Sequence, residues 1–371
     1  HGTDLINSDY KDANLGPSFW QDEHFVHVQG ALNVGTDRGI FVLPVDFRPS
    51  RNTSFVCGTA VDDSNNVTRP LLVTILTDGL VILDESDDVL DAVDTLEIKA
   101  TFAYNSSANP IWNSLLPYLS AGSVSLSEPG YFKDPETGWV YLQGRIEHDC
   151  QEAECVVMSG LSDFSIAPRT MTAGQYFVQL EDDGGGRYLH FTPSGDVVVN
   201  GRAGGSMTEI YLDNIILMEE DTSLYNVDDV SATIVPVDQQ WSDAKASQFQ
   251  ALSGGIKQVS GIVIPNNYSF DGSSVGVVPE AVRPVYPTKQ LVPCKISPEV
   301  LTCALYVKPD GEMSVKSSLD GEVPNFTPDG SDNFVSLSGI RYGGFVYNVE
   351  VVVDGSSEIE LLGGSFIEIG V

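Results

Sequence analysis

The chain has 371 residues, which at roughly 100–200 residues per domain indicates two to four domains. It carries 19 Lys and Arg against 52 Asp and Glu, a formal net charge of −33, so we expect no nucleic-acid partner because phosphates would be repelled. No apolar run reaches the roughly 18 residues of a membrane span, and we expect no membrane insertion. The acidic surface is interpreted as a source of solubility, with attraction of Ca²⁺ or of a basic partner as the alternative.

Short runs that alternate apolar and polar residues follow an expected N-terminal arm, residues 1–19. Such alternation is typical of half-buried β-strands. Three of these runs end in a glycine: FVHVQG at Gly30, WVYLQG at Gly144 and IKQVSG at Gly261.

A hairpin signal follows each of these runs, with two alternating segments around a turn that contains glycine. The hairpin glycine comes 49, 51 and 50 residues after the first glycine in the three copies. This near-equal spacing predicts one module of roughly 115 residues repeated three times. The hairpin glycines are Gly79, Gly195 and Gly311.

The sequence therefore predicts an all-β protein of three tandem antiparallel β-sandwich domains with a jelly-roll-like form. The domains are expected at 20–105, 121–222 and 246–344, separated by linkers at 106–120 and 223–245. Residues 345–371 are expected to add C-terminal strands as a β-hairpin segment. The best helical candidate is SDAKASQFQAL at 242–252, interpreted as a linker or cap.

Cysteines and glycosylation sequons give a weak indication of the compartment. Two close pairs, Cys150 with Cys155 and Cys294 with Cys303, suit short disulfide loops in an oxidising environment, with free buried thiols as the alternative. The first residue is His1, which we interpret as the result of a removed leader or of a start inside a longer product. Asn-x-Ser/Thr sequons, which matter only on a eukaryotic secretory route, occur at Asn52, Asn66, Asn105, Asn267 and Asn325.

Motifs of catalysis and of cofactor binding are missing from the sequence. It contains no nucleophile elbow and no zinc spacing, so we expect no catalytic residue, no cofactor and no enzyme activity. Acidic clusters leave Ca²⁺ open without defining a metal site, since none has the EF-hand spacing. Four tryptophans are candidates either for stacking a sugar or for packing at domain interfaces, and the second interpretation is favoured. They are Trp20, Trp112, Trp139 and Trp241.

The segment GYFKDPETGWVYLQGRI resembles the opening of a β-sandwich module that recurs in phage tail-fibre and virion-surface proteins. The second copy lacks the arginine of that module's LP-x-x-x-RP element, since Ala167 precedes Pro168 there, and the first copy lacks the Lys-Asp opening. The matching residues are Tyr131, Lys133, Asp134, Gly138, Val140, Leu142 and Gly144 for the opening; Leu43, Pro44, Arg48, Pro49 and Val278, Pro279, Arg283, Pro284 for the LP-x-x-x-RP element; Asp78-Gly79 and Asp310-Gly311 for a hairpin; and Val335, Leu337, Gly339, Ile340 and Tyr342 for the closing strand.

The resemblance implies a virion structural protein of a bacterial virus: a tail-fibre, receptor-binding or head-decoration subunit at the virion surface. Its implied partners are other virion proteins, a host-surface glycan and further copies of itself. The copies would form a homo-oligomer, for which a trimer is one option. Fold-level likeness does not identify a ligand. The alternative is a non-viral extracellular structural glycoprotein of a surface appendage or coat, which the sequons and paired cysteines favour.

Overall fold

In the computed structural model the described chain is built from β-strands with two short 3-10 helices, so the predicted all-β class is confirmed. The division into three tandem domains, with the boundaries given above, stays a prediction. The structure describes residues 18–33, 38–57, 71–84, 95–104, 110–150, 152, 154–161, 175–179, 187–192, 194–200, 208–217, 241–251, 256–265, 273–280, 283–284, 287–296, 299–317 and 334–343.

The strands are grouped here into three strand sets in chain order. The first consists of β1 (Ser18–Gln21), β2 (Phe25–Asn33), β3 (Gly39–Val42), β4 (Thr53–Cys57), β5 (Leu71–Ile75), β6 (Leu80–Leu83) and β7 (Thr95–Ala103), with a 3-10 helix at Val45–Phe47. The second consists of β8 (Asn113–Ser114), β9 (Ser123–Lys133), β10 (Val140–His148), β11 (Glu154–Met158), β12 (Gln175–Gln179), β13 (Arg187–Phe191), β14 (Val197–Asn200), β15 (Thr208–Tyr211) and β16 (Ile216–Leu217), with a 3-10 helix at Leu116–Tyr118. The third consists of β17 (Trp241–Ala251), β18 (Ile256–Pro265), β19 (Ser273–Val277), β20 (Thr288–Ile296), β21 (Glu299–Val307), β22 (Glu312–Ser317), β23 (Phe334–Ser336) and β24 (Ile340–Gly343).

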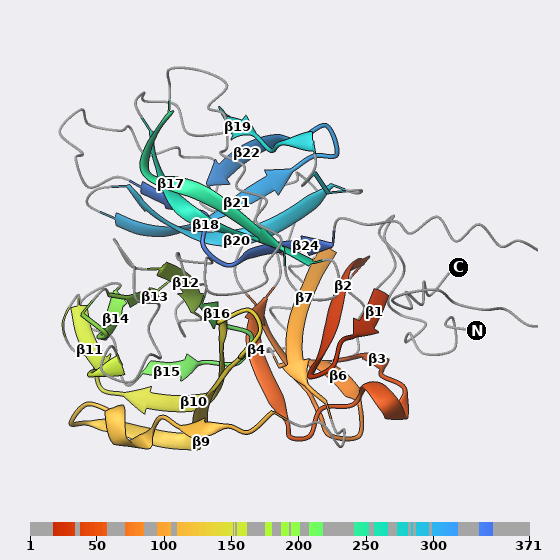
Figure 1. The fold of residues 1–371 in the computed structure, drawn as a ribbon, viewed down its shortest axis with the longest axis vertical. Helices are drawn as coiled ribbons and strands as arrows, with labels where there is room; N and C mark the ends of the chain where they lie inside the picture. The colour runs from red at the N-terminus through yellow and green to blue at the C-terminus, as the bar shows by residue number, and fades with distance from the viewer. Residues whose placement is uncertain are drawn as a thin grey trace, which may run out of the picture.

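The three strand sets pair their strands in the same antiparallel order. The first forms one sheet of order β1-β2-β7 and another of order β3-β6-β5-β4. The second repeats this as β9-β10-β15/β16 and β11-β14-β13-β12, and the third as β17-β18-β23/β24 and β19-β22-β21-β20. In the third set β20 also pairs with β23, so the two halves form one continuous sheet. Figure 1 shows the sets as three lobes that meet near the middle of the molecule.

Each strand set encloses its own apolar core. In the first set, both sheets contribute buried side chains to one cluster that includes Val26, Phe55 and Ile98. The second and third sets have separate clusters of the same kind. Alternation along the strands explains this arrangement, because successive residues point to opposite faces and one face of each sheet is apolar.

The hairpin of each set is tied to an earlier loop by the same hydrogen bond. The backbone N–H of Leu43 donates to Gly79 O at 2.8 Å, that of Leu161 to Gly195 O at 3.0 Å, and that of Val278 to Gly311 O at 2.7 Å. In the first and third sets an arginine reinforces the contact. Arg48 Nε donates to Leu43 O, and Arg283 Nε donates to Val278 O, both at 3.2 Å.

Two segments differ from the sequence expectation. Residues of the expected linker at 106–120 form β8, which pairs with β9, and Leu115 lies in the core of the second set. The helical prediction for 242–252 is wrong, because β17 pairs with β18 from Trp241↔Pro265 to Ala251↔Lys257. Ala, Lys and Gln favour a helix, but backbone pairing with a long neighbouring strand outweighs that weak preference.

Several expectations fall outside the described residues. These are most of the arm at 1–19, the C-terminal segment 345–371 and the sequons at Asn66, Asn105, Asn267 and Asn325.

We expect Gly79→Ala to destabilise the first strand set by about 2 kcal/mol. Gly79 has φ +89°, and a Cβ there would lie 2.6 Å from Leu43 O, so the hairpin bond could not keep its geometry. The matched control is Gly39→Ala, whose added Cβ would meet only Leu80 Cδ1, at 3.7 Å. Urea unfolding of both variants checks this, and equal midpoints for G79A and G39A would contradict it.

Candidate functional site

One arginine contacts all three strand sets. Arg341, on β24, donates from Nη1 to Thr101 Oγ1 of β7 at 3.1 Å. Its Nη2 donates to both the backbone oxygen and Oδ1 of Asn214, each at 2.6 Å, in the turn before β16. The rigid fork of a guanidinium group suits such divergent acceptors. Thr101, Asn214 and Arg341 are called the three-way junction below.

Asn214 completes the free edge of β7. It has a positive φ of 68°, a conformation that asparagine tolerates better than most residues. Its Oδ1 accepts the backbone N–H of Thr101 at 3.0 Å, and its Nδ2 donates to Lys99 O at 2.8 Å. The side chain thus satisfies backbone groups on β7 in the way that a neighbouring strand would.

Residues at matching positions of the three sets meet at this junction. His27, Tyr141 and Gln258 each lie three residues before the glycine that ends the repeated run. Gln258 Nε2 donates to the backbone oxygen of Ile216 at 3.0 Å, which joins the second and third sets. The cross-strand pairs concerned are His27–Thr101, Tyr141–Ile216 and Gln258–Arg341.

An ion pair between the partly exposed Arg51 and the buried Asp213 joins the first and second sets. The Asp213 carboxylate accepts from the Arg51 guanidinium, from the N–H of Gly144 at 2.9 Å and from the N–H of Ser54 at 3.1 Å. Burial raises the pKa of the Asp213 carboxyl, and Arg51 and these hydrogen bonds oppose that rise.

A second polar contact joins the first and third sets. Both oxygens of the Glu97 carboxylate accept the backbone N–H of Lys289, at 3.1 and 3.0 Å. Lys99 Nζ donates to Lys289 O at 2.6 Å and lies 3.6 Å from Glu97. Burial raises the pKa of Glu97, with Lys99 opposing, and burial lowers the pKa of Arg341 to about 10.

Asp22, His27 and Thr101 form a hydrogen-bonded row. His27 Nε2 lies 2.9 Å from Asp22 Oδ2, and Nδ1 lies 3.1 Å from Thr101 Oγ1. Arg341 Nη1 also donates to Thr101 Oγ1, so the Thr101 hydroxyl contacts His27 on one side and Arg341 on the other. A hydrolase triad has the same order of groups, but this hydroxyl belongs to a buried residue and is held on both sides. We interpret the row as support for the junction.

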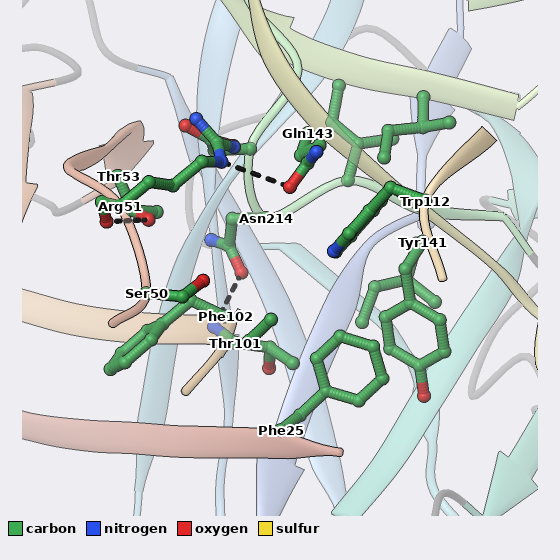
Figure 2. Close-up of a pocket in the computed structure, with 15 residues that line it drawn as sticks. Phe25, Ser50, Arg51, Thr53, Thr101, Phe102, Trp112, Tyr141, Gln143 and Asn214 are labelled. Carbon is green, nitrogen blue, oxygen red and sulfur yellow. Dashed lines mark hydrogen bonds and ion pairs between the residues drawn. The ribbon is translucent and has the colours of Figure 1, made fainter. Parts of the chain in front are cut away.

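Two hollows flank the junction and share Asp213, Asn214 and Ile215. The larger, about 80 Å³, is lined by all three sets, and its charged groups, Lys289 among them, already bind other protein groups. The smaller, about 20 Å³, lies between the first and second sets and includes Trp112 (Figure 2). It is called the aromatic cleft below.

Three of the four candidate tryptophans lie at the boundary between the first and second sets. Trp20 and Trp139 are buried in an aromatic cluster, in which Phe25 of β2 stacks on Tyr141 of β10 with ring centroids 4.0 Å apart. Trp112 packs against that cluster but is only half-buried. The side chain of Trp241 lies outside the described residues. Among the described tryptophans, only Trp112 has the exposure that a ligand contact requires.

The four candidate cysteines form two disulfides. Cys150 and Cys155 close a short loop with Cα atoms 5.8 Å apart. Cys294 and Cys303 link β20 to β21, with Cα atoms 6.0 Å apart, inside the core of the third set.

The residues of the junction were not singled out by the sequence. Arg341 lies in the closing strand of the third copy, where a charged residue is expected to face water, and Asp213 lies in the turn between β15 and β16. The one available signal was the repeat itself, because Thr101, Ile216 and Arg341 pair with residues at the same place in the three repeated runs.

Within the described ranges, no group of three His, Cys, Asp or Glu side chains could hold a metal ion. Most acidic clusters that left Ca²⁺ open lie outside those ranges. Among the same residues, no helix is long and apolar enough to cross a membrane. Comparison of the chain with protein-family models, with curated proteins and with solved structures found no match.

We expect Arg341→Ala to destabilise the protein by about 3 kcal/mol, because Thr101 and Asn214 lose charged hydrogen bonds in a buried place. Hydrogen exchange should show faster opening of β7 than in the wild type. Lys308→Ala is the control, since Lys308 pairs with Glu312 at the exposed hairpin and should leave the urea midpoint unchanged. Equal midpoints for R341A and K308A would contradict the role assigned to Arg341.

We expect Glu97→Gln to become more stable relative to the wild type as the pH rises above 4.5. A folded-state pKa above the unfolded value means that the neutral carboxyl stabilises the fold at low pH, and that this contribution is lost as the group ionises. Glutamine stays neutral throughout. The check is the difference in unfolding temperature between E97Q and the wild type across this pH range; a difference that moves the opposite way would contradict the burial argument.

Proposed function

We propose that the chain is a structural protein of the surface of a bacterial virus, which coats the particle or attaches it to a host. The observation that carries the proposal is the contact among the residues of the resembled motif. In the first set, Leu43, Arg48 and Gly79 of the LP-x-x-x-RP element and the hairpin bind one another. Val278, Arg283 and Gly311 repeat these contacts in the third set with the same geometry.

This arrangement gives the short motifs a physical reason. The arginine side chain covers the hairpin glycine, since a Cβ on Gly311 would meet Val278 O at 2.5 Å and Arg283 Nε at 2.7 Å. A glycine, a carbonyl and an arginine are therefore needed together, which supports the motif as a structural unit rather than a chance match.

The composition supports a place at an exposed surface. A net charge of −33 keeps copies of the chain apart except where a defined contact forms. Two disulfides suit an oxidising environment outside a cell.

The test is location. We expect an antibody against the chain to label particles pelleted from culture fluid of the source organism, and Fab fragments of it to slow adsorption of those particles to cells if the role is attachment. Labelling without slowed adsorption indicates a coat role. A chain found only on cells and never on particles would contradict the proposal, and Fab fragments against an unrelated protein are the control.

A non-viral extracellular glycoprotein is the second candidate, and one observation favours it. Asn52 begins the sequon Asn52-Thr53-Ser54 and is exposed; its Oδ1 accepts the N–H of Thr77, while its Nδ2 has no hydrogen bond among the described residues. The atom that carries an N-linked glycan is therefore accessible.

We expect intact mass of the chain from its native source to show an unmodified Asn52 if the viral proposal holds. Glycan at Asn52 would favour the second candidate.

A further inference from the structure

One part of the second strand set differs in charge from the rest of the chain. Residues 100–127 form an uninterrupted run without Asp, Glu, Lys or Arg, although charged residues make up 19% of the sequence. Residues 110–127, which span β8, a 3-10 helix and the first five residues of β9, are called the neutral strip below. His148 meets the strip where its Nδ1 lies 2.9 Å from Ser123 Oγ, and burial lowers the pKa of this histidine, so this flank is also uncharged at neutral pH.

Large apolar side chains are exposed along the neutral strip. Ile111 is 84% exposed, Leu116 52% and Val124 51%. Val156 of β11, which is 46% exposed, adjoins the strip, because the backbone oxygen of the next residue accepts the N–H of Ser120 at 3.0 Å. Among the described residues only two other large apolar side chains are exposed, both in the first set. Exposed apolar surface is therefore concentrated at this place, as it is at protein contacts.

The first part of β9 has an open edge. On one side β9 pairs with β10, whereas on the other side β8 and the residue after it hydrogen-bond to β9 only from Pro129 to Tyr131 in the described chain. Figure 1 shows β9 along the lower margin of the molecule. Open edges are usually protected by charge, by proline or by a bulge. Residues 123–127 hold no charge and no proline, and a register shift between Ser125 and Ser127 leaves a short stretch open to further pairing.

The sequence of this edge is complementary to itself in an antiparallel arrangement. Residues 123–127 read Ser-Val-Ser-Leu-Ser. When the strand pairs with its own copy about Ser125, Val124 lies opposite Leu126 of the second copy, and serines lie opposite serines. A twofold axis produces such an antiparallel pair and places the neutral strips of both copies against each other.

Charge favours a second copy at this position and opposes one elsewhere. Two chains with a net charge of −33 repel each other wherever their acidic surfaces approach. Within the neutral strip this repulsion is removed at closest contact, and acids only border it, with Glu128 at its end and Glu147 opposite Val124 on β10. A basic partner would find no carboxylate within the strip to bind.

We propose that the neutral strip is a contact between two copies of this chain, which pair antiparallel along β9 about a twofold axis. The strip has fewer residues than the roughly 20–30 per side of a standard interface, so the dimer is reversible, with a dissociation constant in about the micromolar range. Glu128 and Glu147 make it depend on salt, since added salt screens their repulsion and tightens the pair. The inference goes beyond the proposed surface role and does not depend on it.

The test is sedimentation velocity of the full chain over a concentration series up to about 100 μM, at low and at high salt. We expect a monomer–dimer equilibrium that shifts toward the dimer as the salt concentration rises. Val124→Glu places like charges in the apolar part of the contact, so it should weaken dimerisation by about tenfold or more. Hydrogen exchange should show protection of residues 123–127 that increases with protein concentration.

Val45→Glu is the matched control, because Val45 is also an exposed valine but lies in the first set, outside the strip. It should leave the dissociation constant unchanged, and the unfolding midpoints of both variants show whether they are folded. A wild-type chain that stays monomeric at both salt concentrations, an assembly larger than a dimer, or equal weakening by V124E and V45E would overturn the inference. Particle labelling is a separate measurement, so the dimer can fail while the surface role stands, and the reverse.

Discussion

The arrangement of this protein depends on the guanidinium group of Arg341. Each of the three strand sets buries its own apolar core, the first and second also share an aromatic cluster, and Arg341 contacts all three sets. Burying a cation is unfavourable, as the lowered pKa of Arg341 indicates, so its hydrogen bonds to Thr101 and Asn214 have to offset that loss. The pairs Arg51–Asp213 and Glu97–Lys289 act at the edges of the same contact region.

Polar contacts of this kind place the strand sets with more precision than an apolar interface would. Each donor needs an acceptor at a defined distance and direction, so a shifted lobe would leave several buried groups unpaired. The aromatic cleft is a result of that fixed placement, because Trp112 and Gln143 come from the second set and Ser50 from the first.

The sequence was sufficient for the features that are local. Alternation, hairpin glycines and their equal spacing predicted the strands, and the hairpin bonds at Gly79, Gly195 and Gly311 follow from the turn chemistry of those residues. The contacts between sets could not be found in this way, since Thr101 and Arg341 are far apart in the chain and each looks like an ordinary strand residue. The helical prediction at 242–252 failed for a related reason: the partner strand β18, not local preference, determines the conformation of β17.

Residues at matching positions of the three strand sets lie together at the three-way junction. This affects which residue types can occupy those positions. If three identical polypeptides met there, every position would be present in triplicate, and three guanidinium groups at one point would repel one another strongly. One continuous polypeptide removes that restriction, because each position can change independently. Here the matching sites hold a threonine, an isoleucine and an arginine, so a single cation is present, and it donates to Thr101 and to Asn214.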